Sequence, residues 1–228
     1  MMNSKQLRAK AWESLKGKYW KAFFVCLVLG LLVSIGTSFV TAAQNMTDVV
    51  NMVDPAELDS TMQLGALVLS GAALVSALIG FLINLFVGDA AEVGLANYFI
   101  KNIDSNPSFK EAFSGFKVKY GRNIGTLLLV GIKTVLWTLL FVIPGIIKTY
   151  EYAIIPYILA DDANISSKEA FKKANQMMKG NKWRLFKLQF SFIGWGVLCV
   201  LTVGVGTFFL IPYVNAANAE FYAELKNN

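Results

Sequence analysis

Uncharged apolar runs alternate with short charged stretches along the whole chain. Residues 22–43 and 64–88 carry no charged side chain, and each run is long enough to cross ~30 Å of hydrocarbon as a helix. A third run, 124–143, contains one charge, Lys133. This pattern predicts an all-α integral membrane protein.

Three further apolar runs follow, and short breaks divide the later runs into pairs. Pro144-Gly145 separates the third run from the fourth, and residues 204–206 separate the fifth from the sixth. The fourth and sixth runs are shorter than the roughly 20 residues that a simple span needs, so they either cross the membrane or re-enter it. The three later runs are residues 146–160, 188–203 and 207–219.

The distribution of Lys and Arg favours one of these alternatives. Residues 101–122 and 161–187 are basic, whereas residues 44–63 contain acidic side chains and no Lys or Arg. Six crossings place the two basic stretches, the N-terminus and Lys226 in the cytoplasm, as the positive-inside rule requires. We therefore expect about six transmembrane helices in the bacterial cytoplasmic (inner) membrane, with both termini cytoplasmic.

Two segments of the chain have closely similar sequences. Residues 4–23 (SKQLRAKAWESLKGKYWKAF) and 167–186 (SKEAFKKANQMMKGNKWRLF) share Ser, Lys, Ala, Lys-Gly, Trp and Phe at the same spacing, and residues 108–113 (SFKEAF) resemble the start of the second segment. Such internal repeats indicate repeated structural units. Within a single membrane domain, 1–228, we predict three repeated helical hairpins, approximately 4–100, 108–161 and 166–226.

Each repeated segment has the character of a basic amphipathic helix. Apolar residues recur along one face from Leu7, whereas Lys5 and Arg8 lie elsewhere around the helix. A helix of this kind lies in the plane of the lipid headgroups, so we expect an interfacial helix before each hairpin. The Lys-Gly and Trp positions then set depth and orientation. We predict four membrane-interface anchors: Lys16, Trp20, Lys179 and Trp183.

Polar residues within the apolar runs form the candidate functional site. Lys133 lies near the middle of the third run, and Lys148 and Glu151 are neighbours at i, i+3 in the fourth. Ionisable side chains at membrane depth indicate function by default. Two interpretations are open: a polar pathway or headgroup-binding pocket, or a buried ion pair that fixes the hairpin geometry, with Lys148 extended to the interface.

The second apolar run has one face of small and polar residues. Asn84 belongs to this face and is included in the candidate intramembrane polar site. Faces of this kind allow helix backbones to approach closely in lipid, either within one chain or between copies. We expect packing within the chain. The face consists of Ala72, Ser76, Gly80, Asn84 and Gly88.

Composition supports a membrane protein. Of the 228 residues, 55% are hydrophobic and 16% are charged, whereas a soluble domain has roughly 45–50% apolar and about 25% charged residues. The net charge of +6 taken alone suggests nucleic acid. The apolar excess instead favours basic loops at the cytoplasmic membrane face, and we expect no nucleic-acid partner.

The chain lacks the usual side chains of an enzyme site. It contains no histidine, which is the commonest general base and metal ligand. Its two cysteines, Cys26 and Cys199, lie within apolar runs and fit a packing role. Neither a phosphate-binding loop nor a zinc motif is present. We predict no enzymatic activity, no catalytic residue, no metal site and no cofactor.

Five sequence blocks resemble a known family. They are residues 15–21 (LKGKYWK), 141–148 (FVIPGIIK), 152–161 (YAIIPYILAD), 178–186 (MKGNKWRLF) and 189–195 (QFSFIGW). Together they are similar to the bacterial polytopic membrane family numbered nine hundred and seventy-five in the domain-of-unknown-function series, over essentially the whole chain. The resemblance implies a bacterial inner membrane protein. The family has no agreed activity, so it assigns no site residue.

Two functional hypotheses follow. The first is a non-enzymatic scaffold or accessory factor of the bacterial envelope in contact with lipid, because the chain combines basic interfacial helices with an absence of catalytic groups. Its expected partners are the lipid bilayer and either another membrane protein or a second copy of the chain. The alternative is a small-solute or lipid transporter or channel that uses Lys133 and Glu151.

Reporter fusions test the six-span topology. We expect a fusion after Asn51 to lie outside the cytoplasm, and fusions after Asn106, Asn164 and the C-terminus to lie inside, because the positive-inside rule places the basic stretches there. Paired periplasm-active and cytoplasm-active reporters at each position serve as mutual controls. An external Asn164 would contradict six crossings.

Overall fold

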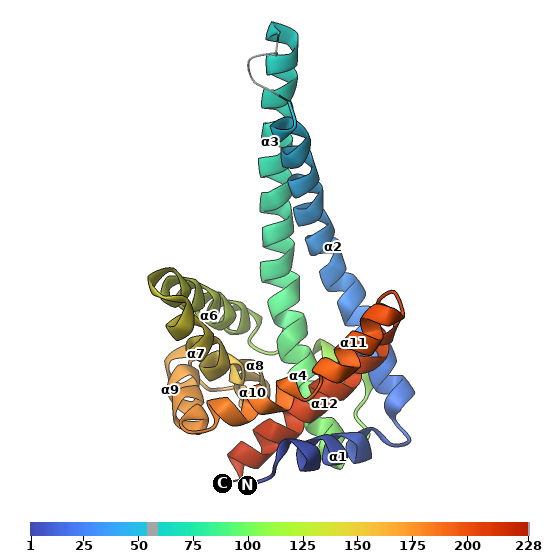
Figure 1. Ribbon diagram of the computed structural model, residues 1–228. Helices are drawn as coiled ribbons and strands as arrows, with labels where there is room; N and C mark the ends of the chain where they lie inside the picture. Colours follow the sequence, from blue (N-terminus) through green and yellow to red (C-terminus); the bar gives the residue numbers. More distant parts are fainter. Residues whose placement is uncertain (54–58, 228) are drawn as a thin grey trace. The chain divides into compact units, whose positions relative to one another are not determined.

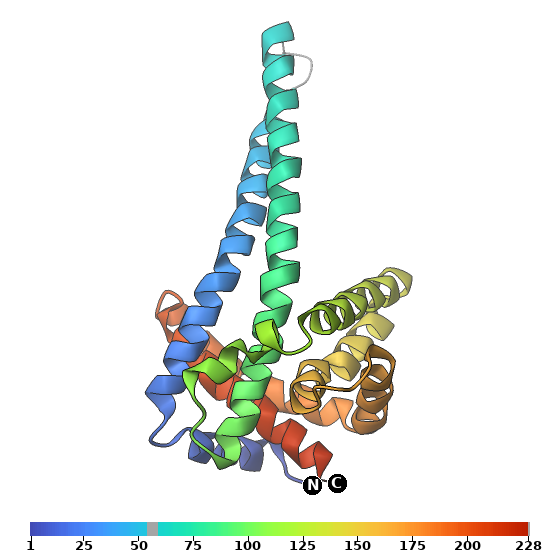
Figure 2. The same ribbon diagram turned by 180° about the vertical axis from the view of Figure 1, so that it is seen from behind.

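The computed structural model describes residues 1–53 and 59–227 (Figures 1 and 2). Asp54 and Glu57 of the acidic stretch lie outside the described residues. The described chain is helical and contains no strand, which confirms the predicted all-α class. It divides into a larger unit, Met1–Val28 with Asp89–Asn228, and a hairpin unit, Leu29–Gly88.

The hairpin unit is built from two long helices that lie side by side (Figures 1 and 2). Helix α2 spans Tyr19–Asn51 and α3 spans Ser60–Ile83, followed by one π-helical turn, η2, at Asn84–Gly88. The carboxylate of Asp59 caps α3 by accepting hydrogen bonds from the backbone N–H groups of its first turn. Both helices are apolar and long enough to span a bilayer.

Ser76, Gly80 and Asn84 of the predicted small-residue face pack within the chain, whereas Ala72 of that face is exposed. The hydroxyl of Ser76 donates to the carbonyl of Phe39, at 2.9 Å, across the two helices. A Cβ at Gly80 would lie 2.7 Å from the carbonyl oxygen of Gly36, so the backbones are in direct contact there. As expected from the sequence, this face joins α3 to α2 rather than leaving small residues unused.

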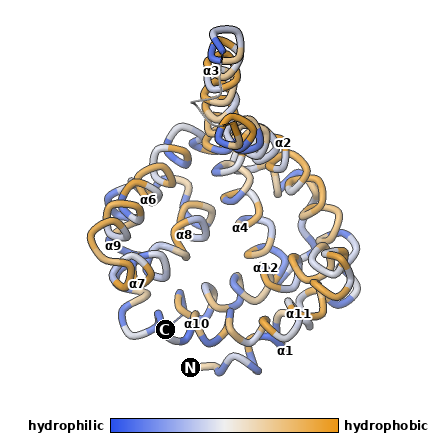
Figure 3. The backbone as a smooth tube through the Cα atoms, turned by 45° about the horizontal axis from the view of Figure 1, so that its top comes forward, coloured by the Kyte–Doolittle hydropathy of each residue, from blue (hydrophilic) through white to orange (hydrophobic). Residues whose placement is uncertain are grey.

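The larger unit contains the remaining helices. Hydrophobic stretches are visible along α6, α7 and α11 (Figure 3). The elements are α1 (Ser4–Leu15), α4 (Asp89–Asp104), η3 (Phe109–Phe113), α5 (Ser114–Lys117), α6 (Tyr120–Leu140), α7 (Val142–Tyr152), α8 (Ile155–Asp161), α9 (Ser167–Met178), α10 (Lys182–Phe190), α11 (Ile193–Leu201) and α12 (Val205–Lys226).

Helix α4 forms the centre of the larger unit. It packs against α1, α8, α12 and the segment η3–α5. Its Tyr98 and Phe99 are fully buried, together with Phe221 and Tyr222 of α12 and Ile158 of α8. Aromatic rings of this size supply a large share of the burial energy of a core. The core therefore lies between α4, α8 and α12.

A close backbone contact fixes η3–α5 on α4. A Cβ at Gly94 would lie 1.9 Å from the carbonyl oxygen of Ala112, and a Cβ at Gly115 would lie 2.0 Å from that of Ala90. No side chain fits in either position without moving the backbone. The two glycines are therefore required by packing rather than by backbone conformation.

Four helical stretches of the described residues are long and apolar enough to cross a membrane, compared with the six that were predicted. They are Tyr19–Asn51, Ser60–Asp104, Tyr120–Leu140 and Lys182–Leu201. The fourth apolar run is not one helix, because the chain breaks at 153–154 between α7 and α8. With 11 residues, α7 is about 16 Å long, which is too short for a simple span.

The turn before α7 also differs from the prediction. The chain reverses at Phe141, whose backbone is extended, and Pro144-Gly145 lies inside the first turn of α7. Proline is tolerated there because the first N–H groups of a helix have no intrahelical acceptor. A Cβ at Gly145 would lie 2.7 Å from the Cα of Thr138, so Gly145 lets α7 pack closely on α6.

Helices α1 and α9, which contain the similar segments, have matching local structures. Each has 12 residues and begins with a capping box, formed by Asn3 with Gln6 in α1 and by Ser166 with Glu169 in α9. Each buries three apolar residues at i, i+4 and i+8, at positions that correspond in the two segments. These residues are Leu7, Ala11 and Leu15 in α1 and Ala170, Ala174 and Met178 in α9.

Both helices end on a Lys-Gly pair. Lys16 and Lys179 are the C-caps, and the following Gly17 and Gly180 have φ angles of 76° and 80°. This left-handed conformation favours glycine, as at many helix ends. The third predicted copy differs, since Phe109–Phe113 form a 3₁₀-helix and Ser114–Lys117 one short α-turn instead of an amphipathic helix.

Substitution of Gly94 tests the close contact on α4. We expect Gly94→Ala to destabilise the protein by about 1–3 kcal/mol, because the added methyl overlaps a backbone oxygen. Gly121→Ala is the matched control: it also lies in a helix, but no heavy atom lies within 4 Å of its Cβ position. Thermal melting in detergent, followed by circular dichroism, measures both. Equal melting temperatures for the two variants would contradict the packing role.

Candidate functional site

The buried carboxylate of Glu151 is the centre of the candidate site. Glu151 lies on α7 and is 3% exposed. Its Oε1 accepts hydrogen bonds from Lys148 Nζ at 2.8 Å and from Asn175 Nδ2 at 2.9 Å, and its Oε2 accepts one from Lys182 Nζ. The carboxylate therefore joins α7, α9 and α10.

Lys133 lies beside this cluster but has a different partner. Its ammonium is 3.7 Å from the centroid of the Phe171 ring on α9, close enough for a cation–π interaction. Among the described residues, no ion pair connects Lys133 with Glu151. Lys133 therefore does not form the buried ion pair with Glu151 and packs instead on an aromatic face.

The cluster borders a cavity of about 320 Å³. Three lysines and one carboxylate line it, so its net charge is positive. Lysine ammonium groups bind phosphate as point charges, and the cavity suits an anionic group of that kind. The lining residues are Lys133, Lys148, Glu151, Tyr152, Phe171, Lys172, Asn175 and Gln176.

The protonation state of Glu151 follows from its neighbours. Burial raises the pKa of this carboxyl group, but the hydrogen bonds and charges of Lys148 and Lys182 outweigh burial and hold its pKa below the ordinary value. Glu151 is therefore ionised at neutral pH. Its negative charge positions two of the lysines, whereas Lys133 and Lys172 form no ion pair with a carboxylate of the described residues.

The structure brings together three of the four residues in the predicted polar site, Lys133, Lys148 and Glu151. Asn84 belongs to the hairpin unit instead, where its Nδ2 donates to the carbonyl of Gly80 at 2.9 Å. It also lies against Gly36 of α2, because a Cβ at Gly36 would be 2.6 Å from the Asn84 amide nitrogen. Asn84 therefore serves helix packing.

The sequence prediction did not include the contributions of α9 and α10. Lys172, Asn175 and Phe171 come from α9, and Lys182 comes from the start of α10. The sequence pattern that could have predicted these residues is the spacing of three polar side chains, at i, i+3 and i+4, in residues 167–186. They are Lys172, Asn175 and Gln176. This spacing identifies a polar helix face but does not show which residue that face contacts.

The four predicted interface anchors are exposed. Lys16 and Lys179 are exposed C-caps, and Trp20 and Trp183 are 62% and 61% exposed. The Trp183 ring stacks on Phe186 with centroids 4.7 Å apart, and Trp20 packs edge-on against Phe23 at 5.7 Å. Large exposed aromatic rings are typical of the membrane interface, and the anchor role remains a prediction.

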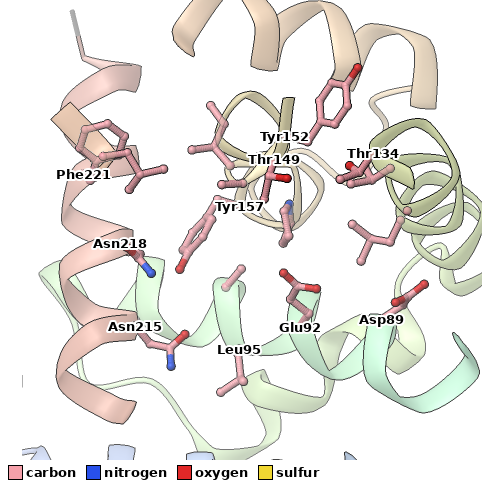
Figure 4. Close-up of a pocket in the computed structure, with 18 of the residues that line it drawn as sticks. Asp89, Glu92, Leu95, Thr134, Thr149, Tyr152, Tyr157, Asn215, Asn218 and Phe221 are labelled. Atoms are coloured by element: carbon pink, nitrogen blue, oxygen red, sulfur yellow. The ribbon is translucent and has the colours of Figure 1, made fainter. Parts of the chain in front are cut away.

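A second, larger cavity lies in the same unit (Figure 4). It has a volume of about 470 Å³ and is lined by residues of α4, α6, α7, α8, α10 and α12. Tyr152 of α7 lines both cavities. The sequence-based site did not include the acidic residues of this cavity, Asp89 and Glu92. The sequence feature that could have identified them is the position of two acidic residues directly after an uncharged run.

Residues 135–228 match the family described as "Protein of unknown function (DUF975)". This match confirms the family resemblance. It covers the four later sequence blocks, from Phe141 onward, whereas the resemblance was expected to extend over essentially the whole chain. It includes Glu151 and its three hydrogen-bond donors, but not Lys133. No curated protein and no solved structure matches the chain.

Removal of the Glu151 charge tests its role in joining three helices. We expect Glu151→Gln to destabilise the protein by about 1.5–3 kcal/mol at pH 7, since Lys148 and Lys182 lose a charged acceptor. Because the folded-state pKa of Glu151 is lowered, this stabilisation is complete above the unfolded pKa of about 4.3. It is lost as the pH falls through the folded pKa.

Thermal melts from neutral to acid pH measure the difference between wild type and Glu151→Gln. Glu111→Gln is the control, because Glu111 pairs with Lys101 at 2.7 Å on the surface. Such a surface pair contributes less than about 1 kcal/mol. A difference for Glu151→Gln that equals the control, or that persists unchanged in acid, would contradict the assignment.

Proposed function

We propose that this protein is a non-enzymatic accessory or scaffold protein of the bacterial cytoplasmic membrane that contacts lipid headgroups. In this proposal the lysine-lined cavity beside Glu151 receives the phosphate of an anionic lipid. The main support for this proposal is that lysines of four helices, α6, α7, α9 and α10, lie around one carboxylate. The cytoplasmic leaflet is rich in anionic lipids, which attract basic groups.

The apolar end of the α6–α7 pair supports this placement. Leu139 and Ile143, on either side of the turn, are 79% and 72% exposed. Large apolar side chains that are exposed together favour a hydrocarbon environment. Along each helix, Lys133 and Lys148 lie about 10–12 Å from the turn at Phe141. Insertion of the apolar end therefore brings both lysines toward the headgroup layer.

Two finer features of the membrane arrangement are part of the proposal. The first is a cytoplasmic location for both termini, with the α6–α7 hairpin entering the membrane from that side without crossing it. The backbone N–H of Met2 donates to Glu224, and the chain ends lie together (Figures 1 and 2), which supports a common side. The second is an internal repeat with interfacial helices, supported by the matched caps and buried positions of α1 and α9.

A small-solute or lipid transporter or channel that uses Lys133 and Glu151 is the second candidate. The position of Tyr152 between two cavities favours it. However, the oxygens of Glu151 already accept from three donors, which is typical of a structural carboxylate. The proposal therefore gives Glu151 a positioning role and gives the lysines the contact with lipid.

Lipid titration tests the headgroup contact. Detergent-purified protein is titrated with phosphatidylglycerol and, separately, with phosphatidylcholine, and bound lipid is counted by native mass spectrometry. We expect preferential binding of phosphatidylglycerol. Lys133→Gln and Lys172→Gln should each weaken it roughly fivefold, since a lysine near an anionic lipid contributes about 1 kcal/mol.

Lys110→Gln provides the control. Lys110 is an exposed lysine of η3 outside the cavity, so this variant removes the same charge without changing the site. Melting temperatures establish that all variants are folded. Equal binding of the two lipids by the wild type, or an equal loss in Lys110→Gln, would exclude the proposed site.

A further inference from the structure

An apolar groove runs between α11 and α12 within the larger unit. Both helices line it with residues at the same spacing, i, i+3, i+4 and i+7, so the groove follows one face of each helix. In α11 and its C-cap these residues begin at Trp195 and end at Thr202, and in α12 they begin at Gly206 and end at Tyr213. Seven residues of helix extend about 10 Å, so the groove is elongated.

The walls of the groove are aromatic and uncharged. Trp12 of α1 and Tyr19, which begins α2, complete the lining, and none of the described lining residues carries a charge. The rings of Trp12 and Tyr213 meet edge to face, with centroids 6.1 Å apart. The volume of about 550 Å³ falls within the roughly 300–1,000 Å³ that is typical of small-ligand sites.

The hydroxyl groups in these walls already have hydrogen-bond partners. Tyr19 donates to a main-chain carbonyl of α12 at 2.7 Å, and Tyr213 donates to one of α1 at 3.2 Å. Thr202 donates to a main-chain carbonyl of α11 at 2.9 Å. The groove therefore presents apolar surface to an occupant rather than free hydroxyl groups, and it suits a hydrocarbon chain.

The dimensions of the groove favour a slender occupant. A volume of about 550 Å³ spread over two helical turns is narrower than an α-helix, whose diameter with side chains is about 10–12 Å. One extended hydrocarbon chain fits this space, whereas a helix of a partner protein does not. The groove therefore differs from a surface for helix packing.

A half-buried cation lies at the α1 end of the groove. Arg8 is one helical turn before Trp12, and its carbonyl accepts the hydrogen bond from Tyr213. Its guanidinium lies 5.9 Å from the centroid of the Phe192 ring. Among the described residues, this guanidinium makes one hydrogen bond, to the carbonyl of Ser191 at 3.1 Å, and no ion pair. A guanidinium has five N–H donors and pairs well with a carboxylate.

Lys5 adds a second positive charge at the same end. It lies three residues before Arg8, on the same face of α1. Lys5 is exposed and forms no ion pair with a carboxylate of the described residues. The groove thus joins an uncharged apolar space to two cations that lack carboxylate partners. This combination is complementary to an amphiphile with one chain and an anionic head.

We propose that the groove binds a long-chain fatty acid, with its hydrocarbon chain along α11 and α12 and its carboxylate at Arg8. A bilayer offers the chain a similarly apolar environment, so the charged contact supplies the selectivity for this occupant. The site is separate from the lysine-lined cavity, and the proposal does not depend on lipid binding there.

Photolabelling tests the site. Detergent-purified full-length protein is irradiated with a palmitic acid analogue that carries a diazirine in its chain, and labelled peptides are identified by tandem mass spectrometry. We expect saturable labelling within residues 193–213, which an excess of unlabelled palmitic acid removes. The exposed apolar turn at Phe141 is the internal control, because its labelling should not saturate.

Two variants of α11 test the chain site. Leu198→Trp should weaken saturable labelling at least tenfold, because Leu198 lines the groove and the larger ring fills it. Leu201→Trp is the matched control: Leu201 lies on the same helix, is 74% exposed and does not line the groove. Melting temperatures establish that both variants are folded.

Three variants of α1 test the head site. Arg8→Gln and Lys5→Gln should each weaken labelling roughly fivefold, since each removes a positive charge near the carboxylate. Lys10→Gln is the control, because Lys10 lies on another face of α1 and lines a different cavity. Lys5→Gln breaks no described ion pair, so it tests the head site even if Arg8→Gln lowers the melting temperature. A diazirine analogue of hexadecanol, which has no charge, should label wild type and Lys5→Gln equally.

Three results would overturn the proposal: labelling at the groove that does not saturate, equal labelling of Leu198→Trp and the wild type, or equal effects of Lys5→Gln and Lys10→Gln. Competition by phosphatidylglycerol without competition by palmitic acid would assign the groove to a phospholipid chain and would also overturn it. Palmitic acid carries no phosphate, and Lys133→Gln should leave its binding unchanged. Failure here is therefore distinct from failure of the proposed phosphatidylglycerol site.

Discussion

The ionised carboxylate of Glu151 is the interaction on which the arrangement of α7, α9 and α10 depends. A charge that is 3% exposed is tolerated only when hydrogen bonds satisfy it, and here three side chains from those helices do so. One carboxylate does not neutralise the four lysines around it. The same contact therefore holds the helices together and leaves an excess of positive charge at the cavity that they surround.

Helix α7 also keeps charges of opposite sign apart. Glu151 and its lysines lie at one cavity, and Asp89 and Glu92 lie at the other, with Tyr152 lining both. If lysine ammonium groups reached the carboxylates of α4, the two sites would neutralise each other. The separation leaves a lysine-lined space and a carboxylate-lined space within one helical unit. Each space keeps an electrostatic preference that a uniform surface charge does not provide.

Local features of this fold were predictable from the sequence, and long-range features were not. The spacing of Leu7, Ala11 and Leu15 gave the buried face of α1, and the uncharged runs gave the long helices. The break between α7 and α8 was not visible, because residues 146–160 are apolar throughout most of their length and only tertiary packing divides them. Lys133, Lys148 and Glu151 were grouped by their depth in the chain, whereas the participation of Lys182 depends on how α10 packs against α7.

The Lys-Gly ends of α1 and α9 place chemically different side chains at corresponding positions. Two residues after Gly17 the chain carries Tyr19, whose hydroxyl donates to the carbonyl of Phe209 at 2.7 Å. Two residues after Gly180 it carries Lys182, which binds Glu151. One backbone geometry thus directs a neutral hydroxyl to a main-chain oxygen in the first case and an ammonium to a carboxylate in the second. The same turn with a different side chain thus lets two similar segments make different contacts while their shape stays the same.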